Sequence, residues 1–193
     1  MHTRRRPLFH LVLTLSALAT LAALSGCSGA AALVPPVQKA APVTDAAQLT
    51  DADGYIPDGS ALTLDSDLPA VRRLDPALLD ALREAAAAAS DRGTAITIAD
   101  GWRSERYQEY LFAQAVREYG SEEEASRWVK RGADSEHVSG KAVDIRTADA
   151  MDFLNRFGSE WGLCQTYANE AWHFERSTEP GGACPAPLAD GRG

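Results

Sequence analysis

The chain has 193 residues, with 19 lysines and arginines against 27 acidic residues, four histidines and three cysteines. A length below about 200 residues favours one domain rather than two. The net charge of −8 argues against a general nucleic-acid binder, because such proteins need a basic surface to meet phosphates. We therefore expect no nucleic-acid partner.

Residues 1–26 have the layout of a secretory leader. Three arginines from Arg4 form a positive region, an apolar run follows over about 8–24, and Cys27 comes directly after a Leu-Ser-Gly tripeptide. The tripeptide and cysteine resemble the lipobox of bacterial lipoproteins, which implies a lipidated Cys27 as the first mature residue. An uncleaved membrane anchor is the alternative, although the run is short for a span of about 20 residues. Either way, we expect an extracytoplasmic chain attached to the bacterial cell membrane.

Removing this leader changes what the composition says. Three arginines and two histidines leave with it, so the mature chain is more acidic and keeps only His137 and His173. Lipidation would use Cys27 and leave Cys164 and Cys184, which in an oxidising compartment are most simply one disulfide. A closed loop of about 20 residues would stabilise the fold by roughly 3 kcal/mol. Two metal-binding thiolates are the alternative.

Composition divides the rest of the chain into a tether, a domain and a tail. Residues 27–50 are rich in Ala, Pro and Val without an amphipathic period, which predicts a flexible tether behind the lipidated cysteine. Residues 51–184 are long enough to bury a hydrophobic core, and 185–193 are expected to be irregular. The sequence shows no surplus apolar patch that would indicate an oligomer, so we expect a monomer.

Capping residues and hydrophobic periods predict four helices and four short strands. The helices should begin after the caps Asp75, Ser104, Ser121 and Thr147 and end near Ser90, Tyr119, Arg131 and Gly158. The strands are expected at 94–98 and at about 141–146, 163–167 and 171–176. This mixed order with short connections predicts an α+β fold, in which helices flank a small antiparallel sheet that carries the site.

Both mature histidines lie in polar motifs that together predict a metal site. His137 and Asp144 are separated by Gly140, whose freedom to turn lets a loop and the next strand aim both side chains at one point. Asp144 faces away from its apolar neighbours in the strand, and a lone buried carboxylate is costly unless it is paired or binds metal. With His173, these residues supply the three ligands of a catalytic zinc site.

Glu170 is the expected general base of this site. In a strand Glu170 and His173 would lie on opposite faces, so a turn or bulge is needed to bring both to one cavity. A glutamate beside the zinc-bound water is the usual base of metal-assisted peptide hydrolysis. Each motif alone also fits a solvated histidine with a simple ion pair, and Trp172 and Phe174 also fit a core.

The two motifs are Ser-x-His-x-x-Gly-x-Ala-x-Asp, starting at Ser135, and Glu-x-Trp-His, starting at Glu170. They resemble those of the VanY-type zinc D-alanyl-D-alanine carboxypeptidases, in the wider group that includes lysostaphin and the hedgehog signalling domain. The resemblance covers about residues 53–177. It implies a small α+β fold and Glu170 as catalytic base. It also implies Zn2+ held by three ligands, namely His137, Asp144 and His173.

A third motif, Gly-Trp-Arg-Ser-x-x-x-Gln from Gly101 to Gln108, resembles a segment of the same family whose arginine lies near the substrate. Arg103 is therefore a candidate for catalysis and substrate binding, since a guanidinium can bind a carboxylate or stabilise an oxyanion. Its alternative is a surface pair with Asp100 or Glu105. Ser135 either binds substrate or shapes the turn, and Gln108 either orders Arg103 or faces solvent.

The resemblance implies a peptidase that removes the terminal D-Ala from D-Ala-D-Ala ends of peptidoglycan stem peptides. Three alternatives stay open: a cell-wall endopeptidase or a D,D-dipeptidase with the same zinc centre, and a non-catalytic zinc-binding module. Two histidines and one carboxylate also suit iron. A lipid anchor at Cys27 would keep such an enzyme within reach of the wall.

Overall fold

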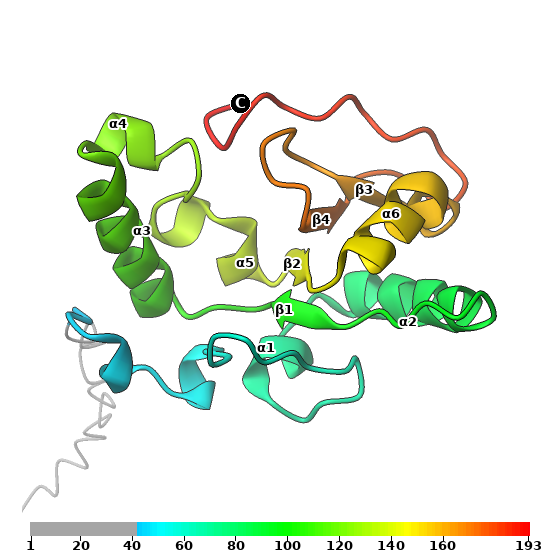
Figure 1. Cartoon of the computed structure of the whole chain (residues 1–193), viewed down its shortest axis with the longest axis horizontal. Helices are drawn as coiled ribbons and strands as arrows, with labels where there is room; N and C mark the ends of the chain where they lie inside the picture. The colour runs from blue at the N-terminus through cyan, green and yellow to red at the C-terminus, as the bar shows by residue number, and fades with distance from the viewer. Residues whose placement is uncertain (1–41) are drawn as a thin grey trace, which may run out of the picture. The chain divides into compact units, whose positions relative to one another are not determined.

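The computed structural model describes residues 42–193, so the predicted leader, Cys27 and most of the tether lie outside the described residues. Within this part of the chain, no helix has the length and apolar character needed to cross a membrane. The helices (Figure 1) are α1 (Pro69–Arg72), α2 (Pro76–Ser90), α3 (Glu105–Tyr119), α4 (Glu122–Ala125), α5 (Glu136–Ser139) and α6 (Ala148–Phe157). The strands are β1 (Ile98–Asp100), β2 (Ala142–Ile145), β3 (Leu163–Gln165) and β4 (His173–Arg176), and short 3₁₀ turns cover Ala46–Gln48, Asp51–Asp53, Gly132–Asp134 and Gly158–Trp161.

The four strands form one antiparallel sheet in the order β1-β2-β4-β3. The predicted α+β class, with a small antiparallel sheet flanked by helices, is confirmed. In the register, Asp100 pairs with Asp144, and Asp144 pairs with His173. Paired residues point to the same side of a sheet, so three polar side chains from neighbouring strands lie in one row.

Two strands begin later than the sequence predicts. β1 begins at Ile98 rather than at residue 94, because its partner β2 ends at Ile145, which pairs with Ile98. Beyond that pair, the Arg146 N–H still donates to the Thr97 carbonyl, at 2.9 Å. β4 begins at His173 rather than at residue 171, because the preceding residues form a turn. Strand ends are thus set by the partner and by the turn, not by β-propensity alone.

Helices α2 and α6 cover the apolar face of the sheet. Helix α2 begins at Pro76, and the Asp75 carboxylate caps it by accepting from two backbone N–H groups, at 2.9 and 3.3 Å. The sheet contributes Val143, Ile145 and Phe174 to the core, each at most 1 % exposed. The helices contribute Leu78, Leu82, Ala85, Ala89, Ala150, Phe153 and Leu154.

Helix α3 lies on the other side of β1 from α2 (Figure 1), and it has the predicted ends. The Ser104 hydroxyl accepts from the Tyr107 N–H at 3.2 Å, and Gly120 ends the helix with φ 84°. The next helix, α4, was expected to continue to about Arg131 but ends at Ala125. The Ser126 hydroxyl donates to the Glu123 carbonyl, a local bond that competes with continuation of a helix.

The compact unit extends beyond the predicted range 51–184 at both ends. Val43 and Leu49 are buried in a cluster with Tyr107 of α3, so the packed structure begins before residue 51. In the tail, Leu188 pairs with the 166–168 segment through two backbone hydrogen bonds. Its N–H donates to the Thr166 carbonyl, and its carbonyl accepts from the Ala168 N–H. The tail has no helix or extended strand, yet it is packed against the domain.

The predicted disulfide between Cys164 and Cys184 is present, with a Cα–Cα distance of 5.7 Å. It joins β3 to the irregular segment that leads into the tail. With both sulfurs used in this bond, the alternative of two metal-binding thiolates is excluded.

Candidate active site

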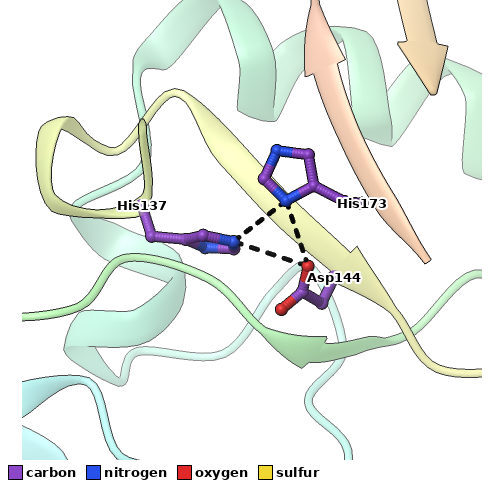
Figure 2. A group of neighbouring side chains, drawn as sticks. All are labelled: His137, Asp144 and His173. Carbon is purple, nitrogen blue, oxygen red and sulfur yellow. Dashed lines mark hydrogen bonds and ion pairs between the residues drawn. The ribbon is translucent and has the colours of Figure 1, made fainter. Parts of the chain in front are cut away.

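Three side chains from three elements converge at one point (Figure 2). His137 comes from α5, Asp144 from β2 and His173 from β4. The His137 Nε2 lies 3.2 Å from the His173 Nδ1, and the Asp144 Oδ1 lies 3.4 Å from each of these nitrogens. All three residues are buried, at 4 to 8 % exposed. The predicted ligand residues are therefore brought together, with one atom of each at the corners of a small triangle.

The short helix α5 and its glycine explain how His137 reaches this point. The sequence predicted a loop here, but residues 136–139 form one helical turn that ends at Gly140, with φ 76°. A Cβ at Gly140 would lie 2.3 Å from the Arg73 carbonyl oxygen, so the position has no room for any side chain. The chain can therefore reverse within one residue and enter β2, which carries Asp144.

Each histidine is held by a hydrogen bond from the nitrogen that faces away from the triangle. The His137 Nδ1 donates to the Gly101 carbonyl at 2.8 Å, and the His173 Nε2 donates to the Glu175 carboxylate at 2.8 Å. These bonds place a ring proton on each outer nitrogen and turn the inner nitrogens toward the triangle. The arrangement is typical of metal-binding histidines, whose outer N–H is fixed by a carbonyl or carboxylate.

The donor set fits a zinc ion on two observations. Ligand atoms about 2.0–2.1 Å from a tetrahedral zinc lie roughly 3.3 Å apart, close to the observed 3.2–3.4 Å edges. The Asp144 Oδ1 is buried and accepts no hydrogen bond within the described residues. A buried anionic oxygen without a partner is costly, and a cation at the triangle would satisfy it.

Electrostatics in the group favour a deprotonated His137 and an ionised Asp144. Burial and the nearby Arg103 lower the pKa of His137. Burial alone would raise the pKa of Asp144, but the surrounding histidines and Arg103 hold that pKa well below its usual range. Burial opposes a charged His173 as well, yet the neighbouring Asp144 and Glu175 carboxylates raise its pKa to about 9. The group therefore favours a positive charge at its centre.

Glu170 reaches the same cavity through a turn. Its N–H donates to the Tyr167 carbonyl and its carbonyl accepts from the His173 N–H, at 3.3 and 3.2 Å. The turn places the Glu170 carboxylate 3.8 Å from the His173 Nδ1, as a strand could not. Burial raises the pKa of Glu170 to about 7. A carboxylate in this state can accept and release a proton near neutral pH.

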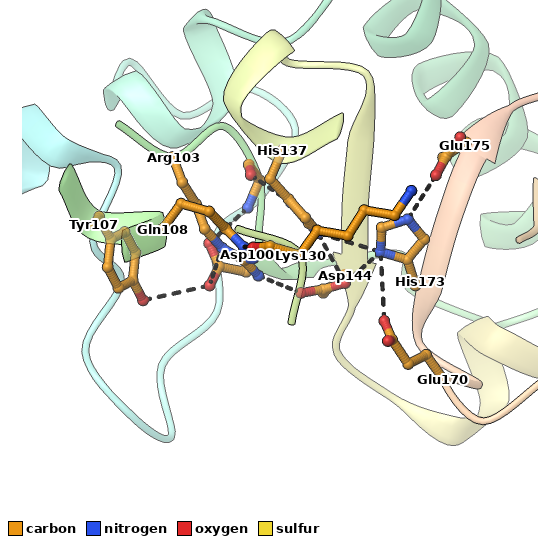
Figure 3. A network of polar contacts seen from close by, with 11 residues as sticks. Asp100, Arg103, Tyr107, Gln108, Lys130, His137, Asp144, Glu170, His173 and Glu175 are labelled. Carbon is orange, nitrogen blue, oxygen red and sulfur yellow. Dashed lines mark hydrogen bonds and ion pairs between the residues drawn. The ribbon is translucent and has the colours of Figure 1, made fainter. Parts of the chain in front are cut away.

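Arg103 lies behind Asp144 rather than free in the cavity (Figure 3). Its Nη2 donates to the Asp144 Oδ2 at 2.7 Å, and its Nη1 donates to the Gln108 side-chain carbonyl at 3.1 Å. Its Nε lies 3.0 Å from the Asp100 carboxylate, an ion pair whose direction is too bent for a hydrogen bond. The expected alternative of a pair with Asp100 is therefore present, but Arg103 is only 8 % exposed, so the pair is not on the surface.

The comparisons with known proteins agree with this geometry. A family model described as VanY, D-alanyl-D-alanine carboxypeptidase, matches residues 71–161, a range that contains Arg103, His137 and Asp144. The matched range, a little under half of the chain, is similar to the VanY family. With the triangle of ligand residues, this match indicates an enzyme, a peptidase of the D-alanyl-D-alanine carboxypeptidase type. Glu170 and His173 lie beyond the matched range, and the structure brings them to the residues inside it.

Solved structures with a similar fold include two that are described as VanY. A mutant of the vancomycin resistance D,D-pentapeptidase VanY from a VanB-type resistance cassette, in complex with Zn(II), is 23 % identical, with a TM-score of 0.53 over 63 % of this chain and 80 % of that one. VanYB in complex with D-alanine-D-alanine is 23 % identical, with a TM-score of 0.52 over 62 % and 80 %. The LdcB LD-carboxypeptidase is 22 % identical, with a TM-score of 0.50 over 63 % and 70 %. At these identities the likeness concerns the fold. No curated protein matches the chain.

The remaining predicted residues of the candidate site lie in or beside a cavity of about 490 Å³. Gln108 is 1 % exposed, and its amide donates to the Lys130 carbonyl at 2.6 Å while its oxygen accepts from Arg103, so it orders the arginine instead of facing solvent. Ser135 is 5 % exposed and lines the cavity, and its hydroxyl makes no hydrogen bond within residues 42–193. The role of Ser135 toward substrate stays a prediction.

Sequence reasoning missed two partners of the triangle formed by His137, Asp144 and His173. Glu175 holds His173, and the Gly101 carbonyl holds His137. The first had a signal, because Glu175 follows His173 by two residues and strand neighbours at that spacing share a face. The second had none, because a backbone carbonyl carries no sequence identity.

Proposed function

We propose that this chain is a zinc-dependent carboxypeptidase that removes the terminal D-Ala from D-Ala-D-Ala ends of peptidoglycan stem peptides. The observation that carries the proposal is the triangle of His137, Asp144 and His173, with its unpartnered buried oxygen and with Glu170 beside it. The substrate is inferred from the family and from the similar folds, of which one holds D-alanine-D-alanine. LdcB, another similar fold, is described in terms of peptidoglycan recognition.

The residues divide the chemistry between them. Zinc bound by the three ligands would polarise the scissile carbonyl and acidify the attacking water. Glu170 takes a proton from that water, whose oxygen forms a bond to the carbonyl carbon of the penultimate D-Ala. The C–N bond then breaks, and Glu170 gives the proton to the leaving amine. Arg103 acts as a positioning residue, because it holds the second oxygen of Asp144 and keeps that ligand ionised.

The bond that is cleaved can be tested with a panel of muropeptides analysed by mass spectrometry. The zinc-loaded protein should release single D-Ala from pentapeptide stems, and chelation of the metal should stop the release. Release of D-Ala-D-Ala or of longer pieces would replace this proposal with a dipeptidase or an endopeptidase. Stems ending in an L,D bond belong in the panel, because an LD-carboxypeptidase shares the fold. Zinc-replete protein that hydrolyses no stem would indicate a binding module, and elemental analysis would separate zinc from iron.

We also propose that Cys27 carries the lipid that attaches the enzyme to the outer side of the cell membrane. The support is the sequence layout of residues 1–26, together with a disulfide that requires an oxidising compartment. A Cys27→Ser chain should move from the membrane fraction to the soluble extracytoplasmic fraction. If it stayed in the membrane fraction, the apolar run would be an uncleaved anchor.

A further inference from the structure

Four large apolar side chains are exposed within residues 42–193, and three of them line the cavity that contains the metal triangle. They are Tyr119, Trp128 and Trp172, each 38 to 40 % exposed. Large aromatic side chains are mostly buried, and apolar groups that gather at one exposed place mark a ligand-binding groove. The proposed chemistry uses none of the three, so their position in the cavity points to a further role in binding.

Two of these aromatic side chains, Tyr119 and Trp128, are stacked on each other. Their ring centroids lie 5.8 Å apart, and their planes differ by 13°. Tyr119 is the last residue of α3, and Trp128 follows α4. Stacking restricts both rings, so the pair offers a flat apolar surface that loses little freedom when a ligand binds.

The cavity follows one face of α3 from the metal triangle to this pair. Residues at helical steps of three and four line it, namely Gln108, Leu111, Ala115 and Tyr119. Gln108 binds Arg103, which in turn binds Asp144, so the first of these residues lies at the triangle. The helix runs from β1 toward α4 (Figure 1), and it rises by about 16 Å from Gln108 to Tyr119.

This length matches the part of a stem pentapeptide that precedes the scissile bond. Four residues lie on that side, and the first is joined through its amino end to a sugar of the glycan strand. An extended chain spans about 3.3–3.6 Å per residue, so four residues reach roughly 13–14 Å. A peptide that lies along α3 with its scissile bond at the triangle would bring the sugar to Tyr119 and Trp128. The single residue that leaves is too short to reach them.

The chemistry of this end of the cavity suits a sugar. The C–H groups of a pyranose ring carry a partial positive charge and pack on the negative face of an aromatic ring. Its hydroxyl and acetamido groups need polar partners, which Gln114 and Glu118 in the last two turns of α3 can supply, since both line the cavity. An acyl chain in the same place would take the Glu118 carboxylate out of water without giving it a partner.

We propose that Tyr119 and Trp128 bind the amino sugar to which the stem peptide is attached, so that the enzyme favours glycan-linked peptides over free ones. This inference rests on the proposed function and deepens it, since it names the part of the substrate that lies farthest from the scissile bond. An aromatic contact of this kind accounts for a preference of about 3- to 10-fold.

The test compares a disaccharide-linked pentapeptide with the same pentapeptide acetylated at its amino end, using zinc-loaded protein. Acetylation removes the terminal charge, so the two substrates differ in the sugar. The unaltered enzyme should show a kcat/KM for the sugar-linked peptide about 3- to 10-fold above that for the acetylated one, mainly through a lower KM.

Variants of the aromatic pair should remove this preference. W128A and Y119A should each lower kcat/KM for the sugar-linked peptide toward the value for the acetylated peptide, with a much smaller effect on the latter. W128F keeps an aromatic ring and should keep part of the preference. Tyr110 lies on the same helix but does not line the cavity, so Y110A is the matched control and should keep the full preference.

Zinc content and thermal unfolding of each variant show that a change is not a loss of fold. Equal kcat/KM values for the two substrates in the unaltered enzyme would overturn the sugar-binding inference and leave the proposed peptidase function intact. Equal losses on both substrates in W128A would also overturn it, because the ring would then contact the peptide or support the fold. Failure to cleave either peptide would instead refute the proposed function, and this inference with it.

Discussion

The two faces of the four-stranded sheet are built from alternating residues of the same strands, yet they do opposite things. On one face, Val143, Ile145 and Phe174 pack against α2 and α6 with almost no exposure. On the other face, Asp144 and His173 are also buried but are charged or polar. A strand of period two can therefore supply stability and chemistry at once, one residue apart.

The energies of the two faces also differ in sign. Full burial of each large apolar side chain contributes about 1.5–3 kcal/mol, whereas a buried and unpartnered carboxylate oxygen costs stability until a cation arrives. The apolar face thus stabilises a polar face whose buried carboxylate favours a bound cation. Substitutions on the polar face should remove activity and leave the fold intact. Substitutions on the apolar face should lower the free energy of unfolding and leave zinc binding intact in the molecules that remain folded.

The largest expected effect on the polar face is that of His137→Ala. It removes one of three ligands, so we expect loss of bound zinc and a fall in activity beyond about 10⁴-fold, with an unchanged far-ultraviolet circular dichroism spectrum. Elemental analysis and a D-Ala release assay measure both. The control is Ser139→Ala, in the same short helix but exposed. Full zinc content in His137→Ala would remove this residue from the ligand set.

Glu170→Gln should separate metal binding from catalysis on that same face. The amide keeps the size of the carboxylate but cannot accept the proton, so kcat should fall by about 10²–10⁴-fold while zinc content stays at one equivalent. Steady-state kinetics on a D-Ala-D-Ala peptide give the first quantity and elemental analysis the second. Full activity in this variant would contradict the assignment of Glu170 as the base.

Phe174→Ala tests the opposite face, one residue away from His173. The side chain is 0 % exposed in the main core, so its truncation should lower the free energy of unfolding by about 3–5 kcal/mol. Urea denaturation measures the loss, and Phe174→Leu, expected to lose less, is the control. The fraction that remains folded should still bind zinc. If zinc binding failed in folded protein, the two faces would not be separable.

The smallest expected effect lies outside both faces, at Asp53. Arg106, with help from Ser104, lowers the pKa of Asp53 to about 2. The folded-state pKa lies below the ordinary value of 3.8, so this carboxylate adds stability above about pH 4 and loses it as the pH falls toward 2. Asp53→Asn should cost roughly 2 kcal/mol at pH 7 and almost nothing at pH 2, as urea midpoints at the two pH values would show. Equal losses at both would exclude the titration of Asp53 as the cause.

Much of the fold could be predicted because its signals are local. Asp75, Ser104 and Thr147 each cap the helix that was expected after them, and the apolar residues of α2 and α6 repeat at helical spacing. The α+β class followed from the mixed order of these elements, and the disulfide from the cysteine count. Strand ends were less predictable, since Ile98 begins β1 only because Ile145 is its partner.

The site was predictable in its members but not in their contacts. His137, Asp144 and His173 stand out by residue type and motif, whereas the target of Arg103 depends on the register that sets Asp100 opposite Asp144. No local pattern specifies a pairing across so much intervening chain. The sequence predicted that a turn or bulge must bring Glu170 and His173 together. It did not predict the form of the turn, which depends on a hydrogen bond to the Tyr167 backbone carbonyl.

The packed tail has a practical consequence for handling the protein. Leu188 is hydrogen-bonded to the segment that leads into the Glu170 turn. The Asn169 side chain and the Gly191 N–H both donate to the Arg127 carbonyl. The Arg127 side chain also forms an ion pair with Asp190. Residues after Leu188 carry none of the proposed chemistry, yet they buttress the loop that aims the base. An affinity tag fused to the carboxyl end, or a protease that removes it, would therefore disturb the turn that carries Glu170 without touching the turn itself.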